Sequence, residues 1–217
     1  RWPSLKFDVQ SINGLMSPFF SAGFYYKTFM WPAKFWKLLY EPLIRRSAGL
    51  GRAAAGPDPD HYEKAFAHCD VLVIGGGPAG LMAALTGGRA GARVILAEED
   101  FMFGGRLLSE RLLLDGKPAR DWLRAVVTEL RGLDNVTLMP RTTMFGVYDG
   151  GTYGAVQRVA DHVKVPGEHR PRQRSWHIAA KRAVLASGAI ERGIAFSGND
   201  LPGVMLGSGV RSYLNRF

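Results

Sequence analysis

The stretch from Asp70 to Asp100 constrains the fold of this chain more than any other part of the sequence. It opens with a short, β-branched apolar run at 71–74, which has the pattern of a strand buried on both faces. A glycine-rich turn, a helical apolar spacing and a second apolar run at 93–97 follow, and the second run closes on Glu98. This order predicts two parallel strands joined by a helix.

The turn between the first strand and the helix reads Gly75-x-Gly77-x-x-Gly80. Gly75 permits a tight turn, Gly77 lets the backbone approach a pyrophosphate, and Gly80 lets helix and strand pack closely. The start of the helix adds free N–H groups and the positive end of its dipole. Glu98, 18 residues after Gly80, is placed to accept hydrogen bonds from a ribose. The stretch therefore predicts that the chain binds a dinucleotide.

The residues around the adenosine half of such a ligand can be placed from the same pattern. Glu98 should hold the adenosine ribose, and Glu99 and Asp100 should lie beside the adenine. Thr143 and Met144 follow the third expected strand and should offer backbone groups to the adenine edge.

Further residues are expected along the rest of the ligand. Gly105 and Arg106 should reach the phosphates, and the guanidinium would add a charged contact. Ser187 and Gly188 end a later strand and should approach the far half of the cofactor. The expected cofactor-binding residues are Gly75, Gly77, Pro78, Ala79, Gly80, Glu98, Glu99, Asp100, Gly105, Arg106, Thr143, Met144, Ser187 and Gly188.

The residues themselves leave NAD and FAD as alternatives, because both ligands present an ADP ribose and a pyrophosphate to the same loop. The carboxylate of Glu98 argues against NADP, whose 2′-phosphate it would repel, and no arginine follows at positions 99 or 100.

Signals for bond-breaking chemistry are missing from the sequence. None of the five histidines pairs with a second metal-ligating residue at a suitable spacing, and no nucleophile and base stand together. Cys69 is the single cysteine, so the sequence holds no CxxC pair and fits a reducing compartment, which favours the cytoplasm. We therefore expect no catalytic residue and no metal site in this chain.

The remaining pattern predicts an α/β fold. A short helix at 61–67, a helix from about 118 to 133 and a strand at 136–139 are expected, followed by a β-meander with Asp149-Gly150-Gly151 as a hairpin turn. The expected meander strands are 143–148, 155–160 and 175–179, and a separate buried strand at 182–186 follows them. Together these elements predict a Rossmann-like FAD/NAD(P)-binding domain of the glutathione-reductase type, with a parallel sheet plus a β-meander.

Residues 1–56 differ from the rest of the chain. They carry +6 of the total net charge of +9, and the stretch from Phe19 to Pro32 is dense in aromatic residues without a clean period. We expect an aromatic, basic arm and linker at 1–56, with one short helix after Pro32. The arm should pack on the chain's own Rossmann domain, on a partner or on a neighbouring domain. The dinucleotide-binding domain should occupy 57–217 and be truncated before a second half. No base-reading module and no membrane-length apolar run is visible, so neither nucleic acid nor a membrane is expected as a partner.

Several segments resemble the alpha subunits of heterotetrameric sarcosine oxidases. They are WPSLKFDV at 2–9, PFFSAGFYYKTFMWP at 18–32, YEPLIRR at 40–46, HCDVLVIG at 68–75 and GNDLPGVM at 198–205. The likeness covers essentially the whole chain, and the aromatic arm is far more specific than the glycine turn. Related amine- and opine-oxidising subunits look less similar over residues 1–56.

The resemblance implies a function. That family oxidatively demethylates sarcosine with O2 and tetrahydrofolate, giving glycine, H2O2 and 5,10-methylenetetrahydrofolate. In it the beta subunit holds FAD and the sarcosine site, FMN lies at the alpha–beta interface, and the alpha subunit binds NAD. The resemblance thus favours NAD for this chain, beta, gamma and delta subunits as partners, and sarcosine and folate sites elsewhere in the complex. It also implies an internal fragment that is inactive alone.

The residues leave two other functions open. The chain could be the FAD-binding domain of an independent amine or opine dehydrogenase, or a non-catalytic assembly module whose nucleotide is structural or absent.

Overall fold

A computed structural model describes residues 4, 6–19, 23, 29, 31–114 and 116–217 of the chain. The chain divides into two compact units, Arg1–Asp58 and Pro59–Phe217, and each is described by itself. The division into domains expected from the sequence, at residue 56, stays a prediction.

The first unit consists of short helical segments without a buried core. None of its described residues is buried, and apolar side chains such as Leu15 and Trp31 are more than four-fifths exposed. The expected short helix after Pro32 is confirmed, as a π-helical turn that leads into an α-helix. Most of the aromatic stretch at 19–32 lies outside the described residues. The segments are η1 (Val9–Ser11), α1 (Ile12–Leu15), η2 (Ser17–Phe19), η3 (Trp36–Tyr40) and α3 (Glu41–Ser47).

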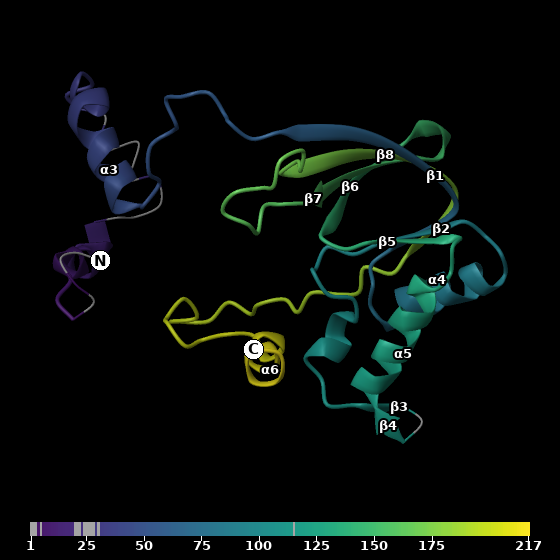
Figure 1. Ribbon diagram of the computed structural model, residues 1–217. Helices are drawn as coiled ribbons and strands as arrows, with labels where there is room; N and C mark the ends of the chain where they lie inside the picture. The colour runs from purple at the N-terminus through teal and green to yellow at the C-terminus, as the bar shows by residue number, and fades with distance from the viewer. Residues whose placement is uncertain (1–3, 5, 20–22, 24–28, 30, 115) are drawn as a thin grey trace. The chain divides into compact units, whose positions relative to one another are not determined.

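The second unit is built on a six-stranded sheet with the order β5-β2-β1-β8-β7-β6 (Figure 1). The first four strands run parallel, and β7 pairs antiparallel with both β8 and β6. The strands are β1 (Tyr62–Ile74), β2 (Val94–Ala97), β5 (Val136–Met139), β6 (Thr142–Tyr148), β7 (Thr152–Arg158) and β8 (Gln173–Leu185). This is the α/β fold with a parallel sheet and a β-meander that the sequence predicts.

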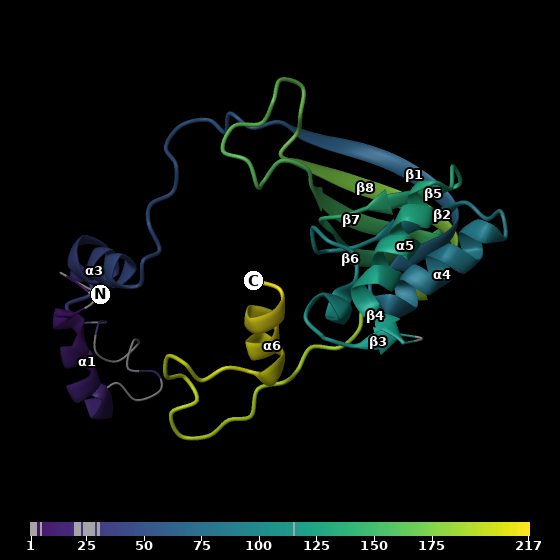
Figure 2. The same ribbon diagram turned by 60° about the horizontal axis from the view of Figure 1, so that its bottom comes forward.

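Helices and smaller elements connect these strands. The helix after the glycine turn, the long helix near residue 120 and the hairpin turn at 149–151 are all confirmed. An irregular segment, 186–206, leads from β8 to the last helix (Figure 2). The elements are α4 (Pro78–Arg89), η4 (Gly105–Leu108), β3 (Leu113–Leu114), β4 (Lys117–Pro118), α5 (Ala119–Arg131), η5 (Asp149–Gly151) and α6 (Gly207–Asn215).

Three expectations about β1 and β8 are wrong. Residues 61–67 form no helix, because β1 starts at Tyr62 and pairs with β8 from its first residue, Tyr62 with Gln173. The expected strands at 175–179 and 182–186 are one continuous strand, whose first half pairs with β7 while its whole length pairs with β1. The end of this strand is not buried either, since Leu185 is 76% exposed. Pairing between segments about 110 residues apart decides these structures, and local pattern does not carry it.

The sheet has a core on each face. On one face, Val73 and Leu96 pack with Leu81 of α4 and Leu123 of α5. On the other, the core spans the four parallel strands and β7, and its buried members are Cys69, Leu72, Ile95, Met139, Ala155 and Ile178. β6 lies at the edge of the sheet that is far from β2 in the strand order. Even so, the N–H of Thr142 at the start of β6 donates to the carbonyl of Glu98 just after β2, at 2.7 Å. The sheet therefore curls until its meander edge meets the end of β2.

Gly80 fixes how closely α4 approaches β1. A Cβ atom at this position would lie 1.8 Å from the carbonyl oxygen of Gly75, a distance that requires backbone movement. We predict that Gly80→Ala destabilises the protein by at least 1–3 kcal/mol, the usual cost of overpacking, measured as a lower midpoint of thermal unfolding. Gly209→Ala in α6 is the matched control, because its Cβ would meet nothing within 4 Å. Equal unfolding midpoints for the two variants would contradict the close approach.

Candidate functional site

A cavity of about 750 Å³ lies at the carboxyl ends of the parallel strands. Its walls come from the ends of β1 and β2 and the starts of α4 and β6. The segment from η4 to Glu110, the segment after β8 and the start of α6 complete them. Open α/β sheets bind ligands at this edge. The expected cofactor-binding residues that line it are Gly75, Gly77, Pro78, Ala79, Glu98, Glu99, Gly105, Arg106, Thr143, Met144, Ser187 and Gly188. Gly80 and Asp100 do not line it.

The glycine turn leaves backbone rather than side chains at the cavity floor. Gly75 has φ of +105°, and a Cβ there would lie 2.4 Å from the carbonyl oxygen of Ala186. A Cβ at Gly105 would lie 2.9 Å from the Cα of Gly77, so position 105 needs glycine for these two segments to come together. The N–H of Gly104 donates to the carbonyl of Gly76 at 2.7 Å and secures that contact. The resulting cradle suits a ligand that approaches the backbone closely.

The start of α4 opens into this cradle. Pro78 occupies the first turn, Gly77 is its cap residue, and no side chain caps the helix. Helix N-termini of this kind bind phosphate through backbone N–H groups and the helix dipole.

Glu98 is held in place by backbone donors. One carboxylate oxygen accepts the N–H of Gly76 at 2.5 Å, and the other accepts the N–H of Asp100 at 2.8 Å. The carboxylate therefore sits beside the glycine turn at the end of β2, where it lines the cavity. This is the position from which an acid can accept hydrogen bonds from ribose hydroxyls.

Asp100 points to a different partner. Its carboxylate accepts both terminal nitrogens of Arg216, at 2.6 and 2.8 Å, and lies outside the cavity lining. Burial raises the pKa of Asp100, but the hydrogen bonds and charge of Arg216 outweigh it, so the pKa lies below its usual value. Arg158 secures the same turn by donating to the carbonyl of Glu99 at 2.6 Å. Neither arginine was identified from the sequence, because both come from distant segments and stand in no local motif.

Arg106 also has a partner within the protein. Its Nη2 donates to Glu110 at 2.6 Å, and Nη1 of Arg211 on α6 donates to the same carboxylate oxygen at 3.2 Å. The Glu110 side chain is 8% exposed, and the hydrogen bonds of Arg106 chiefly lower its pKa. All three residues line the cavity, whereas the sequence singled out only Arg106.

Groups for other chemistry lie away from this cavity or are missing from the described ranges. Cys69 is buried in the sheet core, and burial raises the pKa of its thiol to about 11, so the thiol stays protonated. In the part of the chain that the structure describes, no three His, Cys, Asp or Glu residues are placed to hold a metal ion. Within that same part, every helix is too short or too polar to cross a membrane.

The fold and the position of the cavity are those of an α/β protein of the FAD/NAD(P)-binding class, and comparison with known families agrees. Residues 69–214 match the family model described as pyridine nucleotide-disulphide oxidoreductase. The chain belongs to this family, which implies a flavin or nucleotide cofactor.

More specific relatives are sarcosine oxidase alpha subunits. The whole chain is 59% identical to sarcosine oxidase subunit alpha of Rhizobium meliloti (strain 1021), of which it spans 22%. It is 46% identical over 172 residues to the subunit alpha of Corynebacterium sp. (strain U-96), covering 78% of the chain and 18% of that protein. Among solved structures, L-proline dehydrogenase from P. horikoshii has a TM-score of 0.56 and 29% identity, over 76% of this chain and 31% of that one. The resemblance to sarcosine oxidase alpha subunits is confirmed.

The pairing of Asp100 with Arg216 gives a pH-dependent prediction. The folded-state pKa of Asp100 lies below the unfolded value, so the pair stabilises the protein at neutral pH. This contribution is lost as the pH falls through the folded-state pKa. We predict that Asp100→Asn costs roughly 1–3 kcal/mol of unfolding free energy at pH 7, and that the difference from the wild type shrinks in acid.

Urea unfolding between pH 7 and pH 3 measures this difference. Asp134→Asn, in the exposed turn before β5, is the control and should leave stability nearly unchanged. A loss for Asp100→Asn that does not depend on pH would contradict the ion pair as its cause.

Proposed function

We propose that this chain binds NAD in the cavity at the carboxyl end of its parallel sheet, as part of the alpha subunit of a sarcosine-oxidase-like complex. The observation that carries the proposal is the combination in one cavity of the glycine cradle, the uncapped start of α4 and the carboxylate of Glu98. Similarity to a sarcosine oxidase alpha subunit over the whole chain supports the choice of family member.

The residues present fit an adenine dinucleotide. An added Cβ would clash with protein backbone at Gly75 and at Gly105. Gly77 lies beside Gly105, and a Cβ there would meet only the Gly105 Cα, at 4.0 Å. The N–H groups at the start of α4 would hold the pyrophosphate, with Arg106 beside them. Glu98 would hold the adenosine ribose, and Glu99, Thr143 and Met144 the adenine.

The remaining expected residues take other parts in this proposal. Ser187 and Gly188 would approach the far half of the ligand from the end of β8. Gly80 would act by letting α4 pack on β1, and Asp100 by fixing the turn that carries Glu98 through its pair with Arg216.

The choice of nucleotide follows from charge and from the relatives. Glu98 would repel the 2′-phosphate of NADP. The arginines near this turn do not offset that repulsion within the cavity, since Arg216 is paired with Asp100 and lies outside the cavity lining. For NAD over FAD the support is the resemblance to sarcosine oxidase alpha subunits.

The activity of the whole complex is the wider part of the proposal. The complex would demethylate sarcosine with O2 and tetrahydrofolate, giving glycine, H2O2 and 5,10-methylenetetrahydrofolate, with FAD and FMN held together with beta, gamma and delta subunits. A bound NAD supplies a nicotinamide that can accept or donate a hydride. The residues of this chain would bind and orient that nucleotide, and the sarcosine and folate sites would lie elsewhere in the assembly.

Identifying the bound molecule tests the proposal directly. The purified complex is denatured, and the released small molecules are identified by mass spectrometry. We expect NAD in proportion to this chain, in addition to the FAD and FMN of the other subunits. Subunit-resolved spectra should show no flavin on this chain. A flavin bound in this cavity would instead support the FAD-binding alternative.

Glu98→Ala should weaken NAD binding by roughly 1–3 kcal/mol, because the ribose hydroxyls would lose their charged acceptor. Isothermal titration calorimetry of nucleotide-free protein measures the change. Glu168→Ala, in an exposed loop outside the cavity, is the control and should bind NAD like the wild type. Unaltered affinity of Glu98→Ala would overturn its assignment to the ribose.

A further inference from the structure

One buried carboxylate anchors two arginines at the cavity wall. Glu110 Oε1 accepts Nε and Nη2 of Arg106 at 3.0 and 2.6 Å, and Nη1 of Arg211 at 3.2 Å. Glu110 Oε2 is buried without a hydrogen-bond partner among the described residues. Buried polar atoms are usually satisfied, so an arrangement that leaves one unsatisfied calls for an explanation beyond stability.

The two guanidinium groups keep donors for a ligand. The side chains of Arg106 and Arg211 are 70% and 53% exposed, although their partner is buried. The hydrogen bonds to Glu110 use two nitrogens of Arg106 and one of Arg211, and each guanidinium carries five N–H donors. Anchored arginines of this kind bind phosphate oxygens well, because their planar donors are held in place beforehand.

Both arginines lie close to the expected phosphate position. They line the same cavity as Pro78 and Ala79 at the start of α4, and together with Pro78 they also line an adjoining cavity. The segments therefore meet at the end of the helix where a pyrophosphate would bind. Arg211 comes from α6, more than 130 residues after Pro78.

Apart from Arg211, the start of α6 offers few groups that could bind an anion. Glu191, which also lines the cavity, accepts the N–H of Ser208 at 2.7 Å and so occupies the N-terminus of that helix. The hydrogen bond to the Ser208 backbone chiefly lowers the pKa of Glu191, which keeps its carboxylate charged. Arg211 is thus the group through which α6 can meet a negatively charged ligand.

We propose that Arg211 and Arg106, anchored by Glu110, form a two-arginine clamp that binds the pyrophosphate of the adenine dinucleotide together with the start of α4. The proposal rests on the dinucleotide function proposed above and adds α6 to the binding site. The clamp recognises the ADP portion, so NAD and FAD both satisfy it.

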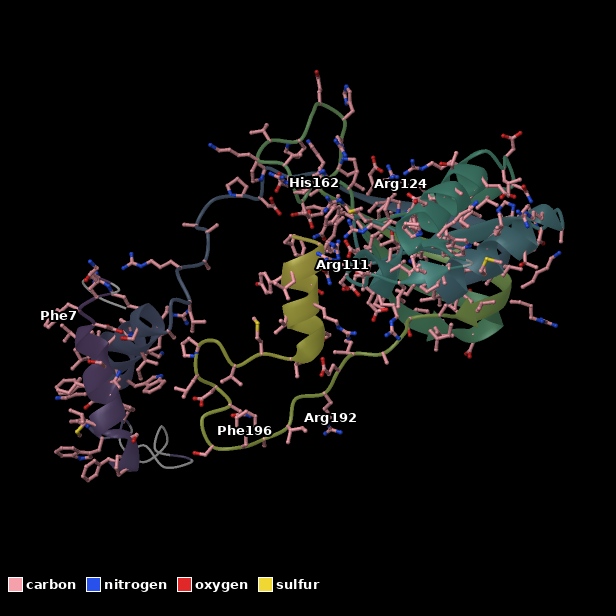
Figure 3. The ribbon with its side chains drawn as sticks, turned by 90° about the horizontal axis from the view of Figure 1, so that it is seen from below. Phe7, Arg111, Arg124, His162, Arg192 and Phe196 are labelled. Atoms are coloured by element: carbon pink, nitrogen blue, oxygen red, sulfur yellow. The ribbon has the colours of Figure 1, made fainter. Side chains whose placement is uncertain are left out.

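Arg211→Gln separates phosphate recognition from the rest of the site. In nucleotide-free protein, purified with the subunits that accompany it, calorimetry should show about tenfold weaker binding of NAD and of ADP. Adenosine, which lacks phosphate, should bind with unchanged affinity. Raising the salt concentration should weaken ADP binding more in the wild type than in the variant, because the exposed part of the interaction is screened. Arg192→Gln, on the irregular segment before α6 (Figure 3), lies outside the cavity lining and should change nothing.

Glu110→Gln tests the anchor. Loss of the anchor predicts weaker ADP binding, although the variant removes a negative charge beside the ligand. If Glu110 acted only as a nearby charge, its loss would tighten ADP binding, and that result would overturn the anchoring role. Unchanged ADP affinity in Arg211→Gln, or an equal loss for adenosine, would overturn the clamp.

The wild type separates these failures from failure of the proposed function. If the wild type binds ADP and NAD while Arg211→Gln matches it, only the clamp is wrong. If the wild type binds none of NAD, FAD and ADP, the dinucleotide function itself is wrong.

Discussion

The rest of the second unit depends on a contact between two stretches of backbone, at Gly80 and Gly75. No side chain separates α4 from the end of β1 there, so the helix starts directly above the turn. That position brings the first amides of α4 to the cavity and lets the neighbouring Gly77 meet Gly105. The apolar packing of Leu81 and Leu85 against the sheet then holds the helix at this height. A turn of bulkier residues would lift the helix and close the cradle.

Much of this unit could be predicted from the sequence because its determinants are local. The strand, turn, helix and strand between residues 70 and 100 follow each other without interruption, and most of the expected contact residues line one cavity. The local signals for this dinucleotide-binding pattern are the glycines of the turn and an acid at a fixed spacing after them. The strand β5 and the hairpin at 149–151 were predicted for the same reason.

The features that the sequence did not reveal depend on distant partners. Residues 62–67 form a strand because β8 lies beside them, and β8 is continuous because β1 and β7 both pair with it. The arginines at 158, 211 and 216 have ordinary surroundings in the sequence, and their roles come from carboxylates and carbonyls more than 55 residues away. Charged residues brought together by topology leave no local spacing to recognise.

The place of β8 in the sheet has a consequence for biosynthesis. Of the six strands of this sheet it is synthesised last, yet it lies between β1 and β7. Until β8 emerges, no strand fills the place between β1 and β7, so each of these two strands keeps an unpaired edge. Such edges favour aggregation, and long-range pairing closes slowly. These two edges stay open in the growing polypeptide until β8 pairs with both of them.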